Sequence, residues 1–312
     1  MNEYLQKIAN ICIMSSSDAD NIGFLSGKMG TILFLYHYSR YSENRVYEEI
    51  ADSELDGICE NLDVRLPINI PDGIAGIGYA VNHLIKYRFA ESDDDDFFSD
   101  VENLIFRDES NYIDQHGRIL LSSSGIYLTS VIDRSNYVKY HERIIEILNT
   151  YRFYFLMATN NQNKPLSIIN SIIFTLMEIG QFEEYKIDVR TIMNRILLFL
   201  QRKNNYEQEN VANLYILRKF LLRFDSYKDL RNQVIKKIKI VDLDLSTTEF
   251  FENYLWQHIL YFPNEKCDFK SFNIDVNKRI DELLSDLSAE ALSIHCGLAG
   301  IGLILLLNKD HL

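Results

Sequence analysis

The sequence predicts an all-α fold built of paired helices, and three observations support this fold class. A glycine-rich motif followed by an apolar run recurs along the chain at nearly regular spacing. Between the copies lie segments with apolar residues at helical spacing and charges elsewhere. No segment alternates polar and apolar residues for long enough to predict a sheet, and only Lys239 to Leu245 suits a short strand.

Three copies of the glycine motif are nearly identical. They read GKMGTILFL from Gly27, GIAGIGYAV from Gly73 and GLAGIGLIL from Gly297. A second glycine follows three residues after the first, on the same helix face, at Gly30, Gly76 and Gly300. A glycine before a helix can adopt backbone angles that other residues resist, and the second glycine lets another backbone segment approach closely. We therefore expect all six to be structural glycines at helix starts.

Four weaker copies fill the interval between Gly73 and Gly297. The third start, SSSGIYLTSVI, carries Ser122, Ser124 and Gly125, and further apolar runs begin near Ser167, Asn213 and Asn253. Successive starts are 40 to 49 residues apart, a period typical of helical hairpin repeats. Gly125 takes the place of a second glycine and is counted with the structural glycines.

Amphipathic helices are predicted between the copies. Apolar residues recur at i, i+3, i+4 and i+7 over residues 137–150, 188–202, 232–240 and 275–287. Each period thus pairs an apolar helix with an amphipathic one, as a two-layered ring of inner and outer helices requires. Seven pairs predict an α/α toroid, with residues 1–312 as a single domain. The strongly apolar last copy favours a ring that closes against the first copy over an open solenoid.

Composition limits the classes of partner. Of the 312 residues 47% are hydrophobic, enough to bury a large core, and the formal net charge is -13. Negative charge disfavours nucleic acid, and the basic run Lys236 to Lys239 fits the polar side of a helix end better. The apolar segment from Ala291 to Leu307 contains Ser293 and His295 and suits a buried helix better than a membrane anchor. We expect no nucleic acid and no membrane as a partner.

The cysteines and the amino-terminal residues predict a cytoplasmic protein. The four cysteines are scattered without a Cys-x-x-Cys pair, at Cys12, Cys59, Cys267 and Cys296. Reduced thiols are the simplest interpretation of this spacing, and they suit the cytoplasm. The first residues lack the positive and then apolar pattern of a secretory signal.

Two histidines support the alignment of the first two copies. His37 and His83 each lie ten residues after the first glycine of their copy. That position is nearly three turns inside the helix, so we expect a core position far from the helix start.

Helix starts in such a ring gather around a central mouth, where backbone amides are free to bind a ligand. Residues at the starts are therefore the candidate site. They are Asp72, Gly73, Ser124, Glu252, His295, Cys296 and Gly297.

Taken together, FLSGKMGTILFL, IPDGIAGIGYAV and IHCGLAGIGLILLL resemble the lanthionine synthetase C-like family, from about Gly23 to Asn308. The resemblance implies an α/α toroid with a zinc ion at its mouth. In peptide-cyclising members the zinc activates a substrate cysteine as the thiolate, which adds to a dehydrated Ser or Thr and forms a thioether. The implied partners are a peptide substrate or a partner enzyme of peptide modification.

The family's zinc ligands lack counterparts here. The family holds the metal with a Cys at the fifth inner helix start and a Cys-His-Gly at the sixth. The fifth start reads ENVANLY from Glu209, and the sixth begins near Phe250; neither has Cys or His at the junction. The family's histidine of the fourth region is absent from SIINSII. We therefore expect a divergent or non-catalytic member of the family that binds a peptide or a partner enzyme during peptide maturation. We expect no cofactor, and the sequence identifies no catalytic residues.

One alternative is an active zinc-dependent cyclase with a rearranged site. His295 and Cys296 are adjacent at the last helix start and can both bind one metal ion. A third ligand would have to come from Cys267, His258 or Cys59.

A second alternative is a glycoside hydrolase, a class that also uses toroids of paired helices. Such an enzyme needs two carboxylates across a cavity, and Asp72 and Glu252 are both predicted at helix starts. Helix capping is the ordinary role of acidic residues at such positions.

Overall fold

The structure is a computed structural model, and it describes residues 2–16, 21–60, 62, 65–90, 95–106, 117–156, 164–240, 244–263, 265–267, 275–285, 288–295 and 297–308. These residues form helices and turns and no strand, which confirms the all-α class. In the segment suggested as a strand, Lys239 and Ile240 end a helix, and residues 241–243 lie outside the described part.

The chain divides into two compact units. The terminal unit comprises Met1–Ile105 and Leu245–Leu312, and the middle unit comprises Phe106–Asp244. That the whole chain forms a single domain stays a prediction.

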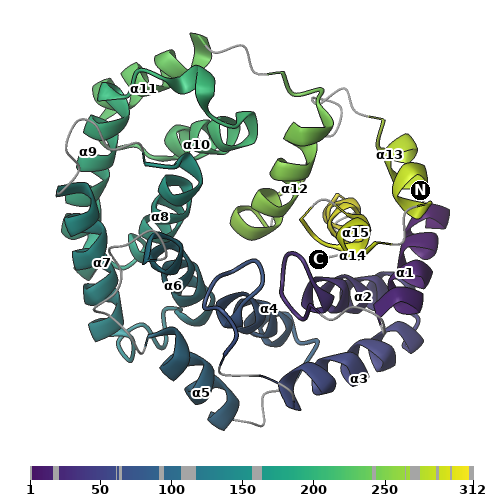
Figure 1. The fold of residues 1–312 in the computed structure, drawn as a ribbon. Helices are drawn as coiled ribbons and strands as arrows, with labels where there is room; N and C mark the ends of the chain where they lie inside the picture. The colour runs from purple at the N-terminus through teal and green to yellow at the C-terminus, as the bar shows by residue number, and fades with distance from the viewer. Residues whose placement is uncertain are drawn as a thin grey trace. The chain divides into compact units, whose positions relative to one another are not determined.

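The terminal unit joins helices from both ends of the chain (Figure 1). Its described helices are α1 (Asn2–Ser16), α2 (Lys28–Ser42), α3 (Val46–Glu60), α4 (Ile74–Lys86), α5 (Asp95–Ile105), α12 (Thr248–Tyr261), α13 (Val276–Leu284), α14 (Ala289–Leu292) and α15 (Leu298–Leu307). Side by side in one row lie α12, α15, α2 and α4. The last copy of the glycine motif therefore contacts the first, as the sequence predicts.

Burial separates the helices of the terminal unit into two kinds. In α15 every residue from Leu298 to Leu307 is buried, and α2 is buried from Met29 to Ser39. In contrast, α3 buries only a stripe that includes Tyr47, Ala51 and Leu55 at a spacing of four residues. The predicted alternation of enclosed and amphipathic helices is thus confirmed in this unit.

The middle unit has the same two-layered plan. Its described helices are α6 (Gly117–Val131), α7 (His141–Leu156), α8 (Leu166–Ile179), α9 (Lys186–Arg202), α10 (Val211–Arg223) and α11 (Lys228–Ile240), with short 3₁₀ turns η1 (Glu183–Tyr185) and η2 (Tyr206–Gln208). One layer is α6, α8 and α10, and the other is α7, α9 and α11. The predicted amphipathic segments 137–150, 188–202 and 232–240 correspond to α7, α9 and α11, with boundaries shifted by up to six residues. The described part of 275–287 corresponds to α13 of the terminal unit.

Two predicted helix starts are wrong. The third apolar helix, α6, begins at Gly117, so Ser122 and Gly125 lie inside the helix and not at its start. The sixth, α12, begins at Thr248, because the Thr247 hydroxyl accepts a hydrogen bond from the Phe250 amide and caps the helix there. Glu252 consequently lies in the second turn of α12 and not at a junction.

The apolar segment from Ala291 to Leu307 is not one continuous helix. It contains the end of α14, a turn at Ser293 to His295, and the ten residues of α15. Among all described helices, none combines the length and the apolar character that a bilayer span needs.

Candidate functional site

The three strong copies of the glycine motif fold into the same loop-to-helix junction in the terminal unit. Gly27, Gly73 and Gly297 cap α2, α4 and α15 in extended conformations, with φ of -137°, -117° and -115°. Residues of any type adopt such angles, so the expectation of unusual backbone angles at these glycines is wrong. At Gly27 and Gly73 the reason for glycine lies in the space around the Cα.

At the first glycine, the preceding loop folds back over the helix start. A Cβ on Gly27 would lie 2.3 Å from the Asn21 carbonyl oxygen, and one on Gly73 would lie 1.9 Å from that of Pro67. The same two oxygens accept hydrogen bonds of 2.9 Å from the first helical amides, those of Lys28 and Ile74. In both copies the acceptor is six residues before the glycine, so one structure is repeated.

The second glycine meets the same loop one turn later. A Cβ there would again lie too close to the carbonyl oxygen six residues back. The distances are 2.4 Å from Gly30 to Phe24, 1.9 Å from Gly76 to Ile70 and 2.2 Å from Gly300 to Ile294. All three strong copies thus confirm the predicted close approach of another backbone segment.

The junction loops are joined to one another by equivalent hydrogen bonds. The His295 amide donates to the Leu25 carbonyl at 3.0 Å, and the Leu25 amide donates to the Pro71 carbonyl at 2.8 Å. Each of these residues lies two positions before the first glycine of its copy. The loops before α15, α2 and α4 therefore lie edge to edge. We call the three loops, Asn21–Gly27, Pro67–Gly73 and Ser293–His295, the junction surface.

Asp72 lies on the junction surface and connects two of its loops. Its carboxylate accepts a hydrogen bond from the Asn21 side-chain amide at 3.2 Å, and its backbone amide donates to the Asn69 side chain at 2.7 Å. The Asn21 side-chain oxygen in turn accepts from the Gly23 amide at 2.8 Å. The side chain therefore has a positioning role in the loops themselves.

His295 is half-buried and stacks on Trp256 of α12. The ring centroids are 6.1 Å apart, and the planes differ by 27°. The buried indole N–H of Trp256 makes no hydrogen bond with any described residue. Cys296, the neighbour of His295 in the candidate metal pair, lies outside the described residues.

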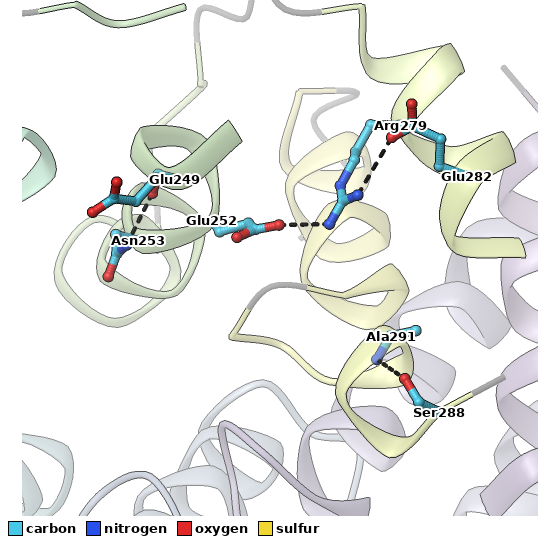
Figure 2. A network of polar contacts seen from close by, with 7 residues as sticks. All are labelled: Glu249, Glu252, Asn253, Arg279, Glu282, Ser288 and Ala291. Carbon is cyan, nitrogen blue, oxygen red and sulfur yellow. Dashed lines mark hydrogen bonds and ion pairs between the residues drawn. The ribbon is translucent and has the colours of Figure 1, made fainter. Parts of the chain in front are cut away.

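Glu252 forms an ion pair that joins two helices (Figure 2). Its carboxylate lies 2.5 Å from the guanidinium of Arg279 on α13, and the same guanidinium reaches Glu282 at 3.4 Å. The Glu252 and Arg279 side chains are 26% and 23% exposed. Glu252 is thus engaged between α12 and α13.

Ser124 and Gly125 belong to the middle unit. Ser124 is buried inside α6. A Cβ on Gly125 would lie 1.9 Å from the Tyr151 hydroxyl of α7 and 2.8 Å from the Thr175 hydroxyl of α8. Gly125 is therefore a structural glycine, but it makes room for side chains of neighbouring helices and not for a junction loop.

The helix starts at which the family would hold zinc carry other groups. At α10 the Asn210 side chain accepts hydrogen bonds from the amides of Ala212 and Asn213, and at α12 Thr247 has the same capping role. An amide and a hydroxyl are not the nitrogen and sulfur ligands that structural or catalytic zinc prefers. The residues at these two positions do not fit the metal. Within the described residues no three His, Cys, Asp or Glu side chains gather as metal ligands do.

The candidate third ligands have other surroundings. His258 is fully buried, its Nε2 donates to the Glu265 carbonyl at 2.8 Å, and its Nδ1 accepts from the Tyr254 hydroxyl at 2.7 Å. Both ring nitrogens are therefore engaged. Cys267 is buried, and its backbone is bound on both sides by the Asn308 side chain. Cys59 is half-buried on α3.

His37 and His83 form a direct pair between α2 and α4. Their Nε2 atoms are 2.9 Å apart, so one ring donates to the other. Burial lowers the pKa of His37 well below its usual value, with His83 and Arg40 adding to the effect. Burial also lowers the pKa of His83 to about 3, and Lys86 and Arg40 add to it. The pair is neutral, and the buried position of His37 confirms the predicted core role.

Two hollows in the structure could not be predicted from the sequence. One is a cavity of about 20 Å³ beside the histidine pair, with room for a single water. It is lined by residues of α2, α4, α12 and α15 together with Phe24, Tyr87 and Pro263. The other is a surface groove in the middle unit, formed by α8, α9 and the segment after α10. Neither could be found from spacing alone, because each is made by elements distant in the sequence.

No model of a known protein family matches the chain, and no curated protein matches it.

Proposed function

We propose that the chain is a divergent lanthionine synthetase C-like protein that binds a peptide or a partner enzyme during peptide modification and does not cyclise the peptide itself. In this proposal the two units together form one α/α toroid of seven helix pairs. The single observation that carries it is the repeated junction of α2, α4 and α15, with the same back-folded loop and the same hydrogen bond between neighbouring loops.

Contacts between the chain's two ends support the closed arrangement. In the junction before α15, the amides of Ile294 and His295 both donate hydrogen bonds to the Leu25 carbonyl, which lies in the junction before α2. An open solenoid instead needs a polar capping face on its last repeat. The complete burial of α15 speaks against such a face.

The helix caps Asn210 and Thr247 support a binding role without zinc. A cyclase of this type needs a thiolate at neutral pH, and the metal is what lowers the proton affinity of the thiol. Without those ligands the chain retains surfaces for a peptide but not the activation step. A cytoplasmic location is part of this proposal.

Metal analysis tests the absence of zinc. The full chain is purified without added zinc, and its metal content is measured by mass spectrometry. We expect well under one zinc per chain. One tightly bound zinc per chain would contradict a metal-free binding role and revive the rearranged site of His295 and Cys296.

Small-angle X-ray scattering tests the closed toroid. A compact chain of this length has a radius of gyration of about 20 Å. We expect that value and a distance distribution with a single maximum. A markedly larger radius, or two maxima, would show that the two units are separate bodies.

A further inference from the structure

A surface groove of about 240 Å³ lies in the middle unit, between the end of α8, the first half of α9 and Phe224–Ser226. Its walls are mostly apolar: Leu176 and Met177 come from α8, and Val189 and Met193 come from α9. Methionine side chains are flexible and polarisable, so they adapt to different partners. The groove therefore accepts apolar side chains of more than one shape.

The size of the groove decides the kind of ligand. Small-molecule sites occupy roughly 300–1,000 Å³ and enclose most of their ligand. A groove of about 240 Å³ is smaller and open, so it fits one or two side chains of a longer partner. A few such buried side chains carry most of the binding energy in protein interfaces.

One wall of the groove is held in place. The Arg231 guanidinium donates to the Phe224 carbonyl at 2.6 Å, which fixes the segment that follows α10. Arg231 also lies 3.7 Å from the Asp225 carboxylate. The groove is thus preformed, which reduces the entropy lost when a partner binds.

Positive charge lines the same helix face. Lys186 and Arg190 are one turn apart on α9 and both border the groove. Lys186 pairs with Glu183, and Arg190 adds a weaker attraction to the same carboxylate. The exposed Arg190 itself makes no hydrogen bond or close ion pair with any described residue. A guanidinium can bind a carboxylate through two parallel hydrogen bonds.

Apolar surface continues beyond the groove. Ile187 follows Lys186 and lies three residues before Arg190, and it is 78% exposed. The chain as a whole carries a net charge of -13, which disfavours acidic partners in general. A local cation beside apolar surface therefore favours a partner that is both acidic and apolar at this place only.

We propose that this groove is the docking site for a partner peptide in which a Leu- or Phe-sized side chain lies within one helical turn of an Asp or Glu. The apolar side chain enters the groove between α8 and α9, and the acid binds Arg190. That the partner is a peptide rests on the proposed function, whereas the place and the chemistry rest on the middle unit alone.

Panning identifies the probe. A phage-displayed library of random 12-residue peptides is panned on the immobilised full chain, and enriched peptides are synthesised with a fluorescent label. We expect enrichment of sequences that combine Leu, Ile or Phe with nearby Asp or Glu. Enrichment of basic peptides, or of none, overturns the inference.

Two variants with the same change in charge locate the binding site. Arg190→Glu should weaken binding of an enriched peptide at least ten-fold in fluorescence anisotropy, and a peptide with its acid changed to Lys should recover part of the loss. Arg202→Glu, at the exposed far end of α9 about 18 Å along the helix axis, should change binding less than two-fold. Circular dichroism checks that both variants are folded.

The outcomes separate this inference from the proposed function. Equal affinities of the wild type and Arg190→Glu would mean that the peptide binds elsewhere, which overturns the groove and leaves peptide binding intact. Equal weakening by both variants would show a general charge effect and also overturns the groove. The metal and scattering measurements do not depend on Arg190, so their results stand in either case.

Discussion

Replacing Gly76 by Ala tests the packing of the junction. The added Cβ would lie 1.9 Å from the Ile70 carbonyl oxygen, and 2.9 Å from both the Ile70 carbonyl carbon and the Phe24 Cβ. The nearest atom belongs to the backbone, so no side-chain rotation relieves the overlap. The loop from Pro67 to Gly73 must move, and its Pro71 carbonyl accepts the hydrogen bond that the Leu25 amide donates.

Two opposing effects set the magnitude. Alanine inside a helix gains about 1 kcal/mol over glycine. Overpacking costs about 1–3 kcal/mol where neighbours can adjust, and a displaced backbone loop falls at the upper end of that range. We expect Gly76→Ala to lower the free energy of unfolding by about 2 kcal/mol.

Gly57→Ala is the matched control. Gly57 lies inside α3, and a Cβ there would meet nothing within 4 Å. Only the helix-propensity gain remains, so this variant should be more stable than the wild type by about 0.5–1 kcal/mol. Urea denaturation followed by circular dichroism measures both variants against the wild type. If Gly76→Ala is as stable as Gly57→Ala, the back-folded loop is not what requires glycine.

Three further predictions follow from buried and paired groups. Burial lowers the pKa of both His37 and His83 below that of the unfolded chain, so their contribution to stability is complete above pH 6.5 and is lost as the pH falls. Each of the two histidines should contribute a slope that approaches about 1.4 kcal/mol per pH unit below pH 6.5 in urea denaturation, because only the unfolded chain binds its proton there. A flat profile from pH 6.5 to 5 would contradict a neutral pair. Burial raises the pKa of the Cys12 thiol to about 12, so iodoacetamide at pH 8 should alkylate Cys12 only after denaturant is added; rapid native labelling would disagree. Glu252→Gln should lower the free energy of unfolding by less than about 1 kcal/mol, because its ion pair with Arg279 is partly exposed. A double-mutant cycle with Arg279→Gln assigns the loss to this pair, and a loss above about 2 kcal/mol would be inconsistent with the exposure.

The glycine repeats could be predicted because their cause is local. A loop that folds back over a helix start excludes a Cβ at two fixed positions, and Gly27, Gly73 and Gly300 show this in three copies. The same reasoning failed at Gly125, where the excluding atom is the Tyr151 hydroxyl of a different helix. A glycine in the sequence indicates that the space beside its Cα is limited, but it does not indicate which segment fills that space.

The candidate site was less predictable because its contacts are distant in the sequence. Glu252 was expected at a helix start, but the cap at Thr247 moves the start back, and Arg279 takes up the carboxylate. The groove was missed for the same reason. Its one sequence signal is the placement of Lys186 and Arg190 at the edge of the apolar stripe of α9, which suits a binding edge.

The most direct test of a metal-free, peptide-binding role is one titration. The full chain is treated with a chelator, and binding of a labelled acidic and apolar peptide is measured by anisotropy with and without added zinc. We expect the same affinity in both conditions. Binding that appears only with zinc would contradict it and would place the peptide at a metal site.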